Sequence, residues 1–119
     1  MRAAVALMAL LLGAGTASGH AFLERAEPRV GSTVKTAPAQ VRVWFTERLE
    51  PAFSTLEVVN ERGERVDKGP AQVDETSPAM LLVTLKPIKP GTYRVTWRVL
   101  SVDTHVTEGD FTFRVAGGQ

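Results

Sequence analysis

Residues Tyr93–Val99 have the sequence YRVTWRV, and their apolar side chains fall at every second position. Successive side chains of a β-strand point to opposite faces, so this period of two predicts a strand with one buried face. Trp97 falls on that face, and we expect its indole to belong to the core. Arg94 and Arg98 fall on the other face, where we expect them to meet solvent.

The same alternation recurs in four further runs, which are separated by turn-forming residues such as Pro and Gly. No stretch shows the sustained apolar stripe of a helix, and no internal repeat is present. Short strands at regular spacing predict an all-β domain, an antiparallel β-sandwich or barrel of about seven strands. The four runs are residues 41–46, 56–60, 81–85 and 111–115.

Three side chains on or beside these strands carry more specific expectations. Tyr93 follows a Pro-Gly turn, and its hydroxyl is expected to bond back to the preceding loop as in a tyrosine corner. Trp44 falls out of phase with its apolar neighbours; we favour packing in the core or against the second sheet, with the opposite face or the edge of a site as the alternative. Met80 is expected to fill the core.

The first nineteen residues have the features of a signal peptide. Arg2 gives a positive start, Ala3–Leu12 is an apolar run too short to span a bilayer, and the small residues Ala17–Gly19 follow. We predict cleavage before His20, with a cut one or two residues earlier as the competitor. The exported protein is therefore expected to be one domain, residues 20–119, that begins with histidine.

Composition narrows the class of partner. The chain has 14 Lys plus Arg and 13 Asp plus Glu, so loss of Arg2 leaves 13 of each and a formally neutral domain. Nothing in this balance suggests nucleic acid or an anionic membrane as partner. There is no cysteine, which excludes disulfides and thiolate metal sites. The carboxyl end has no apolar tail, and no stable membrane anchor is expected.

Asp103 and His105 stand two residues apart, just after the long strand. In an extended segment this spacing points both side chains to one face, roughly 6.5 to 7 Å apart, where one ion could meet both. A loop could do the same. The alternative is that Asp103 caps the turn while His105 is merely exposed.

The pair gains significance when His20 is added. An amino-terminal histidine offers its α-amine and its ring Nδ1 as a chelate, and His105 could add a third nitrogen in the arrangement called a histidine brace. Asp103 could supply an oxygen. Three nitrogens and one oxygen in a tetragonal plane suit Cu(II), with Zn(II) as the natural competitor.

An ordered set of residues then points to a family. The set comprises His20-Ala21, Pro28, Gly31, Ala37-Pro38, Phe45-Thr46-Glu47, the run 90–99, Ser101, Asp103, His105, Gly109 and Phe111-Thr112-Phe113. With these residues the chain resembles the CopC family of periplasmic copper-binding proteins over residues 20–115. The resemblance implies a cupredoxin-like or immunoglobulin-like Greek-key fold and Cu(II) bound through His20, Asp103 and His105. It also implies a place near the copper for Glu47, whose alternative is an ordinary exposed carboxylate.

One departure from the better-known members is informative. Those with a second site bind Cu(I) through a methionine-rich loop, because thioethers favour the reduced ion. Here Met80 is the only methionine after residue 19. We therefore expect a single Cu(II) site.

The function expected from this resemblance is copper homeostasis or resistance: a monomeric carrier, buffer or chaperone, not an enzyme. It would lie in the periplasm, or outside the cell if the host has one membrane. A CopD-type inner-membrane copper transporter is the partner that the resemblance implies.

Two alternatives remain open at this stage. One is a copper monooxygenase, because lytic polysaccharide monooxygenases also use an amino-terminal histidine brace; the position of Asp103 argues against it. The other is a metal-free β-sandwich interaction module.

Overall fold

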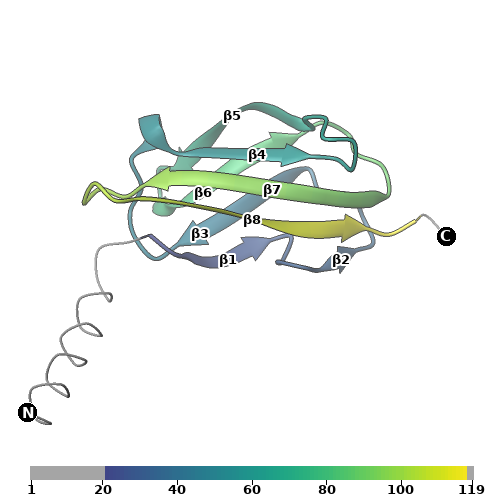
Figure 1. The fold of residues 1–119 in the computed structure, drawn as a ribbon, viewed down its shortest axis with the longest axis horizontal. Coiled ribbons are helices and arrows are strands. Elements are labelled where there is room, and N and C mark those ends of the chain that lie inside the picture. Colours follow the sequence, from purple (N-terminus) through teal and green to yellow (C-terminus); the bar gives the residue numbers. More distant parts are fainter. Residues whose placement is uncertain (1–20, 118–119) are drawn as a thin grey trace, which may run out of the picture.

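The structure is a computed structural model that describes residues 21–117 (Figure 1). The predicted signal peptide and His20 lie outside the described residues. Eight strands follow one another, with one short 3-10 helix after the third. They are β1 Leu23–Glu27, β2 Thr33–Val34, β3 Gln40–Phe45, η1 Pro51–Phe53, β4 Thr55–Val59, β5 Asp67–Asp74, β6 Ser77–Leu85, β7 Gly91–Leu100 and β8 Val106–Val115.

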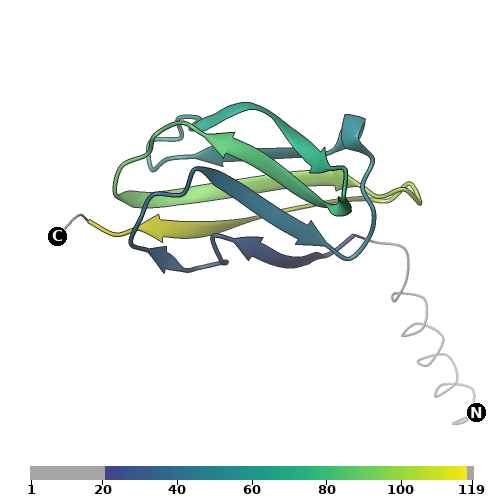
Figure 2. The same ribbon diagram turned by 180° about the vertical axis from the view of Figure 1, so that it is seen from behind.

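The strands form two four-stranded sheets that pack face to face. One sheet has the order β1-β3-β6-β5 and the other β2-β8-β7-β4. Figure 1 looks onto the second sheet and Figure 2 onto the first. All pairings are antiparallel except that of the two-residue β2 with β8. The predicted all-β sandwich is confirmed. Among residues 21–117, no helix has the length and apolar character needed to cross a membrane.

The inward face of β7 supplies the centre of the core, as the alternation predicts. Val95 and Val99 are completely buried, and Trp97 is 8% exposed. The indole of Trp97 meets the ring of Phe45 edge-on, with centroids 5.1 Å apart, so it links the two sheets. On the outer face, Arg94 lies 3.4 Å from Asp110 in an exposed ion pair.

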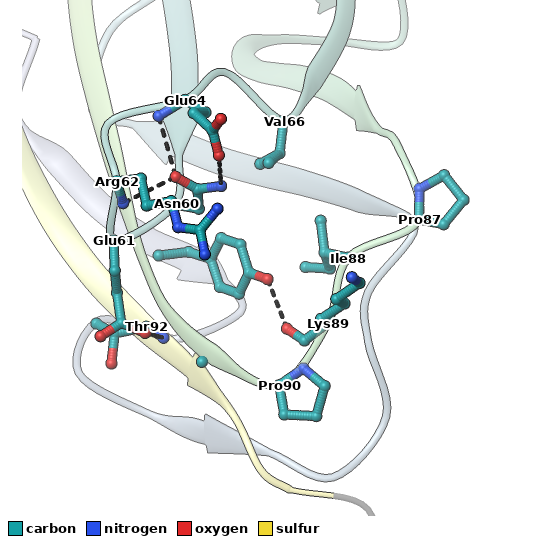
Figure 3. A pocket seen from close by; sticks show the side chains of 12 residues that line it. Asn60, Glu61, Arg62, Glu64, Val66, Pro87, Ile88, Lys89, Pro90 and Thr92 are labelled. Carbon is teal, nitrogen blue, oxygen red and sulfur yellow. Dashed lines mark hydrogen bonds between the residues drawn. The ribbon is translucent and has the colours of Figure 1, made fainter.

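Tyr93 forms the predicted corner. Its hydroxyl donates to the carbonyl oxygen of Lys89 at 2.5 Å, a bond drawn in Figure 3. The ring stacks on Phe113 with centroids 5.5 Å apart. This bond fixes the loop before β7 to the strand itself.

The favoured expectation for Trp44 is wrong. Trp44 is half-buried on the outer face of the β1-β3-β6-β5 sheet, where the guanidinium of Arg25 lies 3.9 Å from its ring centroid. The physical reason is cross-strand pairing, because Arg25 is its register partner on β1 and covers the indole. Met80, the partner of Trp44 on β6, is only 7% exposed, so its expected burial is confirmed, although it lies outside the main core cluster.

Asp67 closes one edge of the sandwich, between β4 and β5. Its carboxylate accepts from the Val58 N–H at 3.0 Å and from Arg65 Nε and Nη2 at 2.8 and 2.6 Å. Burial alone would raise the pKa of Asp67, but the hydrogen bonds from Arg65 and Val58 outweigh it and lower the pKa below its usual value. The buried charge is therefore compensated and joins the two sheets.

Candidate metal centre

The hairpin between β7 and β8 turns through residues 101–105, where the sequence predicts two metal ligands. The Thr104 N–H donates to the Ser101 carbonyl at 2.9 Å, and the Ser101 N–H donates to the His105 carbonyl at 3.0 Å. This is a three-residue hairpin loop whose last residue adopts the left-handed conformation. Thr104 takes that conformation, with φ of 74°, although glycine normally does so. Asp103 and His105 thus flank a strained residue in a tight turn.

Ser101 organises this turn from below. It is completely buried, and its hydroxyl donates to Oδ1 of Asp103. Oγ of Ser101 also accepts from the backbone N–H of His105 at 3.3 Å. One buried hydroxyl therefore contacts both candidate ligand residues and holds them on the same side of the turn.

Asp103 and His105 lie together, with Oδ1 of Asp103 at 3.3 Å from Nδ1 of His105. The hydrogen bond from Ser101 lowers the pKa of the Asp103 carboxyl, and the imidazole of His105 adds to the effect. The carboxylate is therefore ionised at neutral pH and can act as an oxygen ligand. When an imidazole bonds to a carboxylate through Nδ1, its Nε2 is left to bind a metal ion, and this arrangement is frequent among metal-binding histidines.

Glu47 follows β3 in a loop that runs beside the hairpin turn. The carbonyl of Arg48 accepts from the Val102 N–H at 3.0 Å, and Leu49 forms a bridge with Ser101. Glu47 is half-buried in this loop. Among residues 21–117, however, no three His, Asp or Glu side chains gather closely enough to hold a metal ion. Glu47 is therefore near the turn without joining Asp103 and His105 in one cluster.

The segment just before β1 lies against β8. Ala21 is completely buried, and its carbonyl oxygen accepts from the hydroxyl of Thr107 at 2.7 Å. Phe22 N–H donates to Oγ1 of Thr46 at 2.9 Å. Figure 1 shows the start of β1 and the β7–β8 turn at the same end of the sandwich. His20 precedes Ala21 directly, and its own position lies outside the described residues.

The roles of Ser101 and Thr107 were not predicted from the sequence, although a signal was present. Both follow the inward phase of their strands, two residues beyond Val99 on β7 and two before Gly109 on β8. A polar residue in an apolar phase needs a hydrogen-bond partner, because burial without one is costly. That signal marks the end of the strands where the candidate ligands lie.

A pocket of about 400 Å³ lies at the opposite end of the sandwich, between the turn after β4 and the loop before β7 (Figure 3). The side-chain oxygen of Asn60 accepts from the N–H groups of Arg62 and Glu64 at 2.9 and 3.0 Å, and its amide nitrogen donates to Glu64 at 2.9 Å. The polar groups of Asn60 thus shape the turn itself. None of the described predicted site residues lines this pocket.

Comparison with known proteins finds relatives that include a copper resistance protein. Protein YobA of Escherichia coli K12 is 34% identical over 116 residues, 97% of this chain and 94% of YobA. Copper resistance protein C of Xanthomonas campestris pv. juglandis is 32% identical over 117 residues, 93% of this chain and 91% of that protein. The crystal structure of CopC from Methylosinus trichosporium OB3b matches with a TM-score of 0.78 and 31% identity, covering 84% of this chain and 97% of that one.

The CopC domain family matches residues 23–116, which include every strand of both sheets. The relatives align over nearly their whole lengths, and the matched structure shares the fold. This chain belongs to the CopC family.

Proposed function

We propose that this protein is an exported Cu(II)-binding protein that carries or buffers copper, with a single site formed by His20, Asp103 and His105. Membership of the CopC family supports a copper-related function. The observation that supports the finer proposal is the hydrogen bond between Thr107 and Ala21. Thr107 is two residues after His105, and Ala21 directly follows His20, so the bond brings these two parts of the chain together.

Covalent geometry limits where His20 can lie. Consecutive Cα atoms are about 3.8 Å apart. In a chain that starts at His20, the α-amine and the imidazole therefore belong to the residue directly before Ala21, which Thr107 holds in place. The described residues provide one carboxylate and one imidazole at the turn, short of a complete site. An amine and a second imidazole from His20 would complete a set of three nitrogens and one oxygen.

This donor set favours Cu(II). Nitrogen and carboxylate ligands in a tetragonal plane suit that ion, and Cu(II) binds most tightly among the divalent first-row metals. Zn(II) prefers a tetrahedron and a more closed site, whereas the side chains of Asp103 and His105 are 40% and 48% exposed. Glu47 lies in the neighbouring loop, and we propose that it acts through water rather than as a direct ligand.

Binding, rather than catalysis, is the activity that we propose. A carboxylate from Asp103 in the copper plane would occupy the position that an oxygen-activating brace keeps open. We further propose that residues 1–19 direct export to the periplasm and that a CopD-type transporter receives the copper. Oxidation of chitin or cellulose by the copper-loaded protein with a reductant would contradict the binding proposal.

The test combines intact mass with Cu(II) titration of the protein exported by a bacterial host. We expect a chain that begins at His20 and binds one Cu(II). His105→Ala, or one extra residue before His20, should weaken binding by more than about 100-fold, beyond the cost of losing a supporting hydrogen bond. A chain that starts elsewhere, or that is indifferent to copper, would refute the proposal.

Two matched variants locate the carboxylate. Asp103→Asn should weaken Cu(II) binding, because it removes the proposed oxygen ligand. Asp110→Asn, an exposed aspartate on β8 paired with Arg94, should bind copper as the parent does. Glu47→Gln should keep the affinity within about tenfold, the lower limit for loss of an outer-shell partner. Equal losses in Asp103→Asn and Asp110→Asn would show that only overall charge matters.

A further inference from the structure

The segment that precedes β1 is bonded to both sheets. The Thr107 hydroxyl on β8 donates to the carbonyl oxygen of Ala21 at 2.7 Å, across 86 residues of sequence. Thr46, just after β3 in the other sheet, exchanges two bonds with Phe22: Oγ1 accepts from the Phe22 N–H, and the Thr46 N–H donates to the Phe22 carbonyl, both at 2.9 Å. These bonds close the edge of the sandwich at the end that carries Asp103 and His105.

Thr107 occupies a position where the pattern of β8 calls for an apolar side chain. Phe111, Phe113 and Val115 share its phase and are buried, and its register partner on β7 is the completely buried Val99. Valine has the same shape as threonine and would suit this half-buried position without needing a partner. The hydroxyl is satisfied instead by Ala21, whose methyl group belongs to the core cluster.

We propose that Thr107 is a positioning residue for the metal site, because it fixes the residue that carries His20. This inference rests on the proposed function. Strand β8 then positions both histidines of the proposed site. It begins directly after His105, and two residues further along Thr107 holds Ala21, the residue that follows His20. Binding pays an entropy cost for each group that it must order, so a fixed Ala21 reduces the cost of bringing in His20.

The experiment uses the exported protein and three variants. Thr107→Val removes only the hydroxyl, Thr107→Ser keeps it, and Thr112→Val makes the same change on the opposite face of β8, away from the turn. Cu(II) affinity is measured by competition titration and the coordination by electron paramagnetic resonance. Thr107→Val should bind about tenfold more weakly, the scale of losing an outer-shell partner, while Thr107→Ser and Thr112→Val stay close to the parent.

Two further measurements separate positioning from simple stability. Hydrogen exchange at the Phe22 amide of the copper-free protein should be faster in Thr107→Val, because the segment before β1 has lost its hydrogen bond to β8. Thermal unfolding of each copper-free variant reports the cost to the fold. A lower unfolding midpoint with unchanged Cu(II) affinity and an unchanged resonance spectrum would overturn the inference. So would a Thr107→Ser variant that loses as much affinity as Thr107→Val.

The parent and His105→Ala distinguish this inference from the proposal beneath it. If the parent binds no Cu(II), the proposed function fails and the inference fails with it. If the parent binds, His105→Ala does not, and Thr107→Val binds as tightly as the parent, only the positioning role is refuted.

Discussion

Gly109 on β8 is predicted to be intolerant of even one added methyl group. A Cβ built at this position would lie 2.7 Å from Cζ2 of Trp97, 3.1 Å from Cε2 and 3.3 Å from Cη2. Trp97 is its register partner on β7, so the indole lies across the glycine. The space that Gly109 leaves is therefore filled by a neighbouring aromatic ring, and the alanine variant must displace that ring.

The size of the effect follows from how firmly Trp97 is held. The indole is 8% exposed and meets Phe45 edge-on at 5.1 Å, so it has little room to retreat. Overpacking a filled core costs about 1 to 3 kcal/mol. We expect Gly109→Ala to lower the free energy of unfolding by about 2 kcal/mol, which for a domain of this size is a fall of about 8 to 16 °C in the unfolding midpoint.

The assay is urea and thermal unfolding of the copper-free protein, with Gly117→Ala as the control. A Cβ at Gly117 meets nothing within 4 Å, so that variant should match the parent. In a Trp97→Phe background, where the smaller ring makes room, Gly109→Ala should cost at least about 1 kcal/mol less than in the parent. Equal stability of the two alanine variants, or additivity of Gly109→Ala with Trp97→Phe, would refute the packing argument.

Three further predictions concern a buried charge, a strained turn and the metal. Asp67→Asn should lower the free energy of unfolding, measured by urea denaturation, by about 2 kcal/mol. This loss is smaller than the loss expected when one partner of a fully buried ion pair is removed, because the side chain of Arg65 is 55% exposed. Because the folded-state pKa of Asp67 lies below the unfolded value of about 3.9, its contribution is present above that value and is lost as pH falls through the folded pKa; Asp67→Asn should lack this part of the acid dependence. Thr104→Gly should raise the unfolding free energy by about 0.5 to 1 kcal/mol, since it relieves the positive φ at some cost in chain entropy; a destabilised variant would contradict this. Cu(II) affinity should fall steadily as pH drops below neutral, because protons compete with copper for the amine and imidazole nitrogens of the proposed site; titrations at several pH values that give one affinity would exclude the proposed ligands.

Sequence periodicity predicted the four central strands and the edge strand β4, and it missed the other three edge strands, β1, β2 and β5. The runs that became β3, β4, β6, β7 and β8 each bury one face, so alternation reports them. β5 is an edge strand with one buried residue, Asp67, and a break in register between Lys68 and Gln72. Such a strand has no buried apolar series to produce a period of two. Trp44 shows a related limit: its phase differed from that of its apolar neighbours, but burial tendency favoured the core, and only the partner strand reveals the contact with Arg25.

The candidate site could be predicted in part for a related reason. Spacing brought Asp103 and His105 into consideration. In the structure both lie in a turn rather than a strand, with Oδ1 of Asp103 3.3 Å from Nδ1 of His105. The buried hydroxyl of Ser101 that holds them could not be inferred from spacing, since it depends on the loop conformation. The bond from Thr107 to Ala21 joins residues 86 apart, and no local pattern reports such a contact.

The inward series of β8 changes character toward the β7–β8 turn, and this change indicates where the fold gives way to a site. Val115, Phe113 and Phe111 are buried apolar residues; Gly109 then makes room for the ring of Trp97, and Thr107 holds Ala21. A strand serving the core alone would gain from an apolar side chain at Thr107 as well, at roughly 25 cal/mol per Å² of apolar surface buried. The chain forgoes that gain at the end of β8 that follows the turn bearing Asp103 and His105, where Thr107 bonds to Ala21. The exchange suits the proposed metal site on His20, because the hydroxyl of Thr107 holds Ala21, the residue that follows His20.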